Sequence, residues 1–302
     1  MTSLVCIFSL LAVAASPLAP HPQPNPSLQD ALNSADTLPV RAAPALPNSN
    51  IGLFHLGLMP EEGAVTLGHA PAATKRLVVD GHDVRFAPDG SFVIGFDRDF
   101  GPSTLITAFL ADGRNISERL PVKKHNWAIS TLPAATQHPT SDSDFQARRP
   151  DELAQINAAR HVSSDSSGWR QHFIWPARAR ISDVFGSQRV YGTVPAAPHG
   201  GVDLAVPQGT PLLAPADGVV ILAADHPFTL EGNLLMVDHG LGLNSAFLHL
   251  SKIVVKLGDH IKQGQLVGYS GKTGRATGPH LHWGMKWTTE RVDPMSLTGP
   301  MR

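Results

Sequence analysis

Alternating hydrophobic and polar positions along the first part of the chain predict strands rather than helices. Between residues 51 and 132, short apolar or alternating runs are separated by turn sequences such as Asp80-Gly81 and Asp112-Gly113. Asp-Gly between two extended runs is a strong hairpin signal. Six or seven short strands at this spacing are typical of a small β-sandwich. Residues 51–132 are therefore predicted to form an N-terminal β-sandwich-like domain.

A rough helical spacing follows the second linker. Pro150 fits the first turn of a helix, with Asp151 and Glu152 near its positive end, and the pattern continues to about His161. From Phe173 onward, strand and turn patterns return and no long helix is expected. The fold class is therefore predicted to be mainly β, with a C-terminal antiparallel β domain. After the N-terminal domain, the chain is therefore divided into a linker (133–150), a helical connector (151–172) and the C-terminal domain (173–302).

The N-terminus carries an apolar run, Leu4–Ala15, that ends in small residues. It is shorter than the roughly 20 residues of a membrane span, so residues 1–16 are interpreted as a secretory signal peptide. The absence of Lys and Arg before the run departs from the usual pattern and leaves an uncleaved anchor or a misassigned start as alternatives. Residues 17–50, rich in Pro, Ala, Asn and Ser, are expected to be a flexible lead. A periplasmic or secreted protein without a stable membrane span after cleavage is predicted.

Composition narrows the chemistry further. The 302 residues allow about two domains, and a formal net charge of -1 gives no reason to expect nucleic acid as a partner. The single cysteine, Cys6, lies inside the apolar run, so the predicted mature chain has none. No disulfide can then form, and histidine and carboxylate must hold any metal. With 15 histidines in the chain, most are expected to be ordinary surface or core residues.

Two histidines near the C-terminus stand in a pattern that suggests a metal site. A stretch rich in Gly, Ser and Thr ends at Pro279, and the alternating run His280-Leu281-His282-Trp283 follows. Residues two apart in a strand face the same way. His280 and His282 are therefore predicted to project together, and paired imidazoles are common metal ligands.

A second candidate lies upstream, in His199-Gly200-Gly201-Val202-Asp203. The two glycines disfavour a helix, and residues four apart in extended backbone share a face. His199 and Asp203 can then reach one ion, joined by one histidine of the downstream pair. Three nitrogen or oxygen ligands with a fourth position open to water describe a catalytic zinc site.

Three separated motifs carry a family resemblance. They are His-Gly-Gly-Val-Asp-Leu-Ala from His199, Phe-Leu-His-Leu-Ser over Phe247–Ser251, and Gly-Arg-Ala-Thr-Gly-Pro-His-Leu-His ending at His282. In this order they resemble the lysostaphin-type (β-lytic) zinc metallopeptidases of bacterial cell walls. The resemblance covers roughly Ile181–Leu297 and does not extend to the N-terminal domain.

The resemblance implies a role for each site residue. His199, Asp203 and His282 would bind Zn²⁺. His280 would not be a ligand but would join His249 near the open coordination position, as acid/base and oxyanion stabiliser. The implied reaction is hydrolysis of amide bonds in peptidoglycan peptide cross-links. Which of the two histidines is the general base stays open.

Two alternatives also stay open. The first is a non-catalytic peptidoglycan-binding regulator that activates another cell-wall hydrolase; relatives of that kind typically lack one or more ligands, whereas this chain keeps them all. The second is a different peptide substrate, such as a glycine-rich bridge, selected by loops such as 187–198. Peptidoglycan is the expected partner, with cell-wall regulatory proteins as a further class.

Overall fold

The computed structural model describes residues 49–51, 54–133 and 143–301, and residues 41–302 form one compact unit. The predicted signal peptide, nearly all of the predicted lead and part of the linker, 134–142, lie outside the described residues. Within the described residues, no helix is both long and apolar enough to cross a membrane.

The N-terminal half is built from two four-stranded sheets. Their strands, in sheet order, are β1 (Ser49–Ile51), β2 (Phe54–Leu56), β3 (Val65–His69) and β6 (Ser91–Gly95), and then β5 (His82–Val84), β4 (Thr74–Val79), β7 (Ser103–Leu110) and β8 (Asn115–Pro121). Asp80 and Gly81, both with positive φ, form the predicted tight turn between β4 and β5. Phe54, Phe92 and Ile106 are fully buried in the shared core. The predicted mainly β, sandwich-like fold is confirmed.

The last strand of this half pairs outside it. β9 (Ile129–Leu132) runs parallel to β11 (Gln188–Tyr191), and β12 (Val194–Pro195) completes their three-stranded sheet. The partner of β9 is therefore more than 50 residues away in the chain. Alternation within a strand does not reveal so distant a partner, so the boundary predicted at residue 132 does not coincide with the sheet pairing.

The single long helix of the described residues begins earlier than predicted. α2 (Ser143–His161) contains Pro150 in its interior, so the expectation that Pro150 opens the helix is wrong. Tertiary contacts support the first part of this helix. Arg149 makes a bidentate pair with Glu231, with N–O distances of 2.6 and 2.9 Å. These contacts offset the backbone hydrogen bond that a proline removes.

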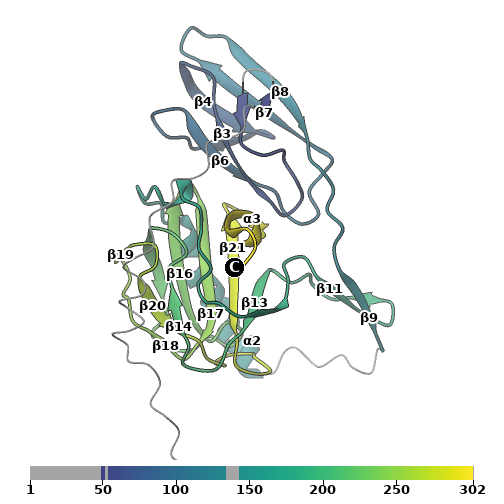
Figure 1. The fold of residues 1–302 in the computed structure, drawn as a ribbon, viewed down its shortest axis with the longest axis vertical. Helices are drawn as coiled ribbons and strands as arrows, with labels where there is room; N and C mark the ends of the chain where they lie inside the picture. Colours follow the sequence, from purple (N-terminus) through teal and green to yellow (C-terminus); the bar gives the residue numbers. More distant parts are fainter. Residues whose placement is uncertain (1–48, 52–53, 134–142, 302) are drawn as a thin grey trace, which may run out of the picture. The chain divides into compact units, whose positions relative to one another are not determined.

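The C-terminal half is organised on an eight-stranded sheet. Its strands are β10 (Arg180–Asp183), β13 (Gly201–Ala205), β21 (Leu281–Trp287), β17 (Leu243–Leu250), β16 (Asn233–Gly240), β15 (Gly218–Ala223) and β19 (His260–Ile261), with β22 (Glu290–Val292) on β21. A smaller sheet holds β14 (Pro211–Leu213), β20 (Leu266–Tyr269) and β18 (Lys252–Ile253); η2 (Gly168–Arg170) and α3 (Met295–Thr298) are short helices. All pairings in both sheets are antiparallel, as predicted, and Figure 1 shows β13, β17 and β21 side by side.

The two faces of the large sheet differ. Leu281, Trp283 and Met285 alternate along β21 on the face that packs into the core. On the opposite face, Ile156 of α2 packs with a small apolar cluster that includes Met236. α2 therefore covers one part of this face.

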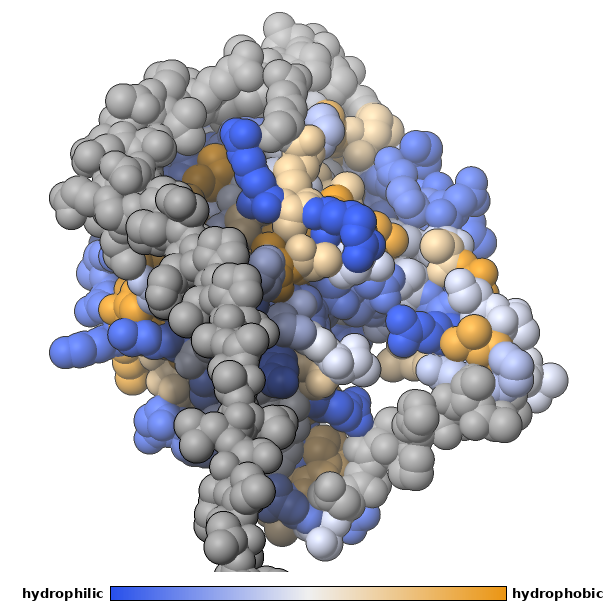
Figure 2. Space-filling view, turned by 60° about the horizontal axis from the view of Figure 1, so that its bottom comes forward, coloured by the Kyte–Doolittle hydropathy of each residue, from blue (hydrophilic) through white to orange (hydrophobic). Residues whose placement is uncertain are grey.

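Apolar side chains exposed among the described residues are dispersed over several elements. Leu58, Ile129, Val194 and Leu257 are the most exposed of the large ones. On the face seen in Figure 2, hydrophobic residues lie among hydrophilic ones and form no single broad patch in the coloured part.

Candidate metal centre and active site

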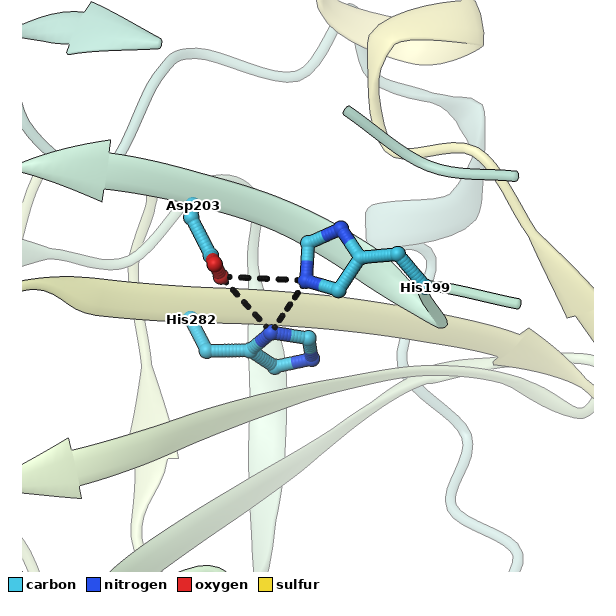
Figure 3. A group of neighbouring side chains, drawn as sticks. All are labelled: His199, Asp203 and His282. Carbon is cyan, nitrogen blue, oxygen red and sulfur yellow. Dashed lines mark hydrogen bonds and ion pairs between the residues drawn. The ribbon is translucent and has the colours of Figure 1, made fainter. Parts of the chain in front are cut away.

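The pairing of β13 with β21 brings the two distant motifs together. Asp203 on β13 lies directly opposite His282 on β21 in the antiparallel register. His199 precedes β13 and turns its ring toward the same point. Figure 3 shows the three side chains with their polar atoms facing one another. The two motifs, some 80 residues apart, therefore share one site.

The three facing atoms are close enough to hold one ion. His282 Nδ1 lies 2.8 Å from Asp203 Oδ1, and His199 Nε2 lies 3.2 Å from that oxygen and 3.0 Å from His282 Nδ1. Two ligand atoms each about 2.0–2.1 Å from a tetrahedral zinc are roughly 3.3 Å apart. The donor set and its spacing therefore fit a metal, and these residues form the one group of this kind among the described residues.

Backbone contacts orient the first ligand. His199 Nδ1 donates to the carbonyl of Val184 at 3.0 Å, which leaves Nε2 facing the cluster. The backbone N–H of Gly186 in turn donates to the His199 carbonyl at 2.9 Å. A ligand held on both its ring and its backbone loses little freedom when it binds a metal.

The charges of the cluster also suit a cation. Burial raises the pKa of Asp203, but hydrogen bonds from His199 and His282 outweigh it and hold the net pKa well below the usual range. Burial lowers the pKa of His282 despite its contact with Asp203, so its neutral form is favoured. Burial also opposes protonation of His199, but the Asp203 carboxylate outweighs it and raises the net pKa. A metal therefore meets one carboxylate and competes with protons for the ligand nitrogens of the two histidines.

His280 lies beside the cluster rather than within it. Its Nδ1 donates to the carbonyl of Gly278 at 2.8 Å, and its Nε2 is 4.0 Å from Asp203 Oδ1. The two histidines of the downstream pair are thus separated by position: His282 reaches the cluster and His280 borders it.

His249 approaches from the end of β17. Its Nδ1 donates to the carbonyl of Thr273 at 2.9 Å, and its ring centroid is 4.8 Å from that of His280. The residue has a φ of 64°, which non-glycine residues rarely adopt. The hydrogen bond from its N–H to the Glu231 carbonyl, 2.8 Å, helps to hold this conformation. Burial lowers the pKa of His249 to about 4 although the Thr273 carbonyl opposes this, so its neutral form prevails near pH 7.

All five predicted site residues line one groove of about 600 Å³. Arg275 and Thr277, from the Gly-rich loop, also border it, as do several residues of the 187–198 loop. The backbone carbonyls that orient the histidines could not be predicted from the sequence, because any residue type can supply a backbone acceptor. Three cationic residues that line the same groove were also not predicted, because they are scattered along the chain: Arg160, Lys286 and Arg291.

His239 illustrates the opposite case, a histidine with an internal structural role. It is fully buried, and its ring contacts the Asp217 carbonyl and Ser245 Oγ, both at 2.8 Å. It does not line the groove.

Comparison with known proteins identifies the family. The profile described as peptidase family M23 matches residues 197–294. The peptidoglycan DD-endopeptidase ShyA of Vibrio cholerae is 41% identical over 132 residues, 43% of this chain and 30% of that protein. The DD-carboxypeptidase/endopeptidase Mpg of Neisseria meningitidis is 38% identical over 102 residues, 34% of this chain and 23% of that protein. The chain thus spans less than a third of the length of either relative.

A solved structure extends the match beyond the site. A Pseudomonas aeruginosa structure described as a peptidase M23 is 31% identical, with a TM-score of 0.61, and the match covers 80% of this chain and 96% of that one. This coverage includes most of both halves of the described fold. Together with the motifs, it establishes that the chain belongs to peptidase family M23.

Proposed function

We propose that this protein is a zinc-dependent endopeptidase that hydrolyses amide bonds in the peptide cross-links of peptidoglycan. The observation that carries the proposal is the cluster of His199, Asp203 and His282 with two further imidazoles beside it in one groove. Such an arrangement has the ligands for one ion and separate groups for proton transfer.

Zinc is the proposed ion, held by His199 Nε2, Asp203 Oδ1 and His282 Nδ1. A set of two histidines and one carboxylate with an open position is typical of catalytic zinc. When bound, zinc supplies Lewis-acid polarisation of a carbonyl and acidifies water.

His249 and His280 are the proposed catalytic residues. Each donates its Nδ1 proton to a backbone carbonyl, so the neutral ring presents Nε2 as an acceptor. One Nε2 takes the proton of the attacking water and returns it to the leaving amine. The other ring stabilises the oxyanion.

The substrate proposal draws on the relatives. ShyA and Mpg are named as DD-endopeptidases or DD-carboxypeptidases, the first of them acting on peptidoglycan. A cross-link between stem peptides is therefore the proposed target, and an extracytoplasmic location, periplasmic or secreted, goes with it. The role of residues 1–16 as an export signal is part of this proposal. Residues 51–132 are proposed as a non-catalytic module, since the groove is lined by residues from Ile156 onward.

Digestion of purified peptidoglycan tests the proposal. The mature protein with zinc is expected to release muropeptides whose masses identify the amide bond that was cut, and a chelator should stop the release. A His249→Ala variant should keep the metal and lose the product, which separates catalysis from metal binding. Product that is equal with and without chelator would contradict the proposal. Wild-type product formation also decides against a purely regulatory protein.

A further inference from the structure

The floor of the groove continues away from the metal centre without large side chains. His282, Gly284 and Lys286 alternate along β21 and share the face that lines the groove. The residues that pair with Gly284 on either side are Gly201 and Ala246. Between His282 and Lys286, this part of the floor therefore has nothing larger than a methyl group, and an extended peptide can lie against it.

Three cationic side chains meet where this floor ends. Lys286 on β21 is the direct cross-strand partner of Arg291 on β22, and Arg160 of α2 lines the same groove. The Cδ of Arg291 lies 3.5 Å from the position of a Cβ on Gly200, so its stem runs beside the loop that carries His199. Like charges directly opposite each other destabilise a sheet. The pairing of Lys286 with Arg291 therefore destabilises this part of the sheet.

None of these cations forms a direct ion pair with a carboxylate of the described residues. The Nε of Arg160 is buried without a hydrogen-bond acceptor. Lys286 Nζ donates to the Thr289 carbonyl at 3.1 Å, which uses one of its three donors. No ion pair within 4.0 Å joins Arg160, Lys286 or Arg291 to a described carboxylate.

Burial and mutual repulsion both lower the pKa values of Lys286 and Arg160. Burial, then the charges of Arg160 and Arg291, lowers the pKa of Lys286 to about 8. Burial, then the charge of Arg291, lowers the pKa of Arg160, and the Glu231 carboxylate, which also lines the groove, acts in the opposite sense. Asp97 and Glu290 act on Lys286 in the opposite sense but do not cancel this effect. An anion placed between the three cations would relieve both the repulsion and the burial cost.

We propose that Arg160, Lys286 and Arg291 bind a carboxylate of the peptide substrate. Lys286 is four residues from His282, so their Cα atoms lie about 13 Å apart along the strand. Guanidinium and ammonium groups around one carboxylate give short, charge-assisted hydrogen bonds. The site therefore favours acidic stem peptides over amidated ones. The inference rests on the proposed function for its substrate class.

Binding and cleavage of matched peptides test this site. Two synthetic cross-linked stem peptides are compared, identical except that the carboxylates of one are amidated. Calorimetry on the zinc-free wild-type protein is expected to find the acid bound about tenfold more tightly or better, the scale of one charge-assisted hydrogen bond. Lys286→Met and Arg291→Gln should each remove most of that preference. Lys262→Met is the matched control, because Lys262 is highly exposed and does not line the groove.

The zinc-loaded enzyme provides the second readout. Lys286→Met should lower kcat/KM for the acid about tenfold more than it lowers kcat/KM for the amide. Its melting temperature without peptide should equal or exceed that of the wild type, because the variant removes a repulsion. Equal binding of acid and amide by the wild type would overturn the carboxylate site. Preferential binding of the acid without cleavage of either peptide would instead support the site and contradict the proposed endopeptidase function.

Discussion

Gly201 offers a sharp test of how the two ligand-bearing strands are packed. A methyl group added there would lie 2.5 Å from the Trp283 carbonyl oxygen and 2.9 Å from both Gly284 Cα and His282 Nε2. Real Cβ atoms essentially never approach other atoms within 3.0 Å. The substitution Gly201→Ala must therefore separate β13 from β21 by at least about 0.5 Å, the difference between that limit and 2.5 Å.

This displacement acts directly on the metal centre, because Asp203 lies on β13 and His282 on β21. Metal–ligand distances tolerate only about 0.2 Å. Overpacking a closely packed position costs about 1–3 kcal/mol, and disturbing the support of a ligand lowers metal affinity about 10- to 100-fold. Competition with a chromophoric chelator should find that loss in Gly201→Ala, and calorimetry should find a lower melting temperature.

The neighbouring glycine provides the matched control. A methyl group at Gly200 would meet only the flexible Arg291 side chain, with Cδ at 3.5 Å and Nε at 3.7 Å. These are ordinary van der Waals distances, so Gly200→Ala should keep the wild-type zinc affinity and melting temperature. If the two variants bind zinc and melt alike, the close approach of the strands is not what positions the ligands.

Three further predictions concern the metal, pH and the helix. Asp203→Ala removes the only carboxylate of the cluster, so equilibrium dialysis should find no bound zinc; retention of one equivalent would refute the ligand assignment. Burial lowers the pKa of His239 to about 4. Because the unfolded chain then binds this proton first, the titration of His239 alone should remove about 3 kcal/mol of unfolding free energy from the zinc-free protein between roughly pH 6.5 and 4. Urea titrations should show a smaller loss in His239→Gln, and an identical loss would contradict this. Arg149→Ala leaves Glu231 without its bidentate partner, so hydrogen exchange in α2 should accelerate, unlike in the exposed control Gln155→Ala; equal exchange would show that the pair does not hold the helix.

Local patterns were informative wherever one short segment decides the outcome. The tight turn at Asp80-Gly81 needs only two residues that tolerate positive φ, and the structure has it where the sequence predicts it. The motif around Asp203 and the alternation through His282 likewise predicted residues that share a site. The local pattern was misleading at Pro150: the helix continues through the proline, and the neighbouring Arg149 is anchored to a distant glutamate.

The sequence by itself determined the residue types available for a metal site, the mainly antiparallel β class and the resemblance to a peptidase family, because turns, alternation and motifs depend on neighbours in the chain. The family resemblance already implied that His282 rather than His280 is the ligand, and the strand register brings His282 to the cluster. Only the tertiary structure decided that backbone carbonyls orient His199 and His249, and that three scattered cations share the groove. These features depend on strand register and helix docking. Both are set by contacts between residues far apart in the chain, and no local pattern encodes them.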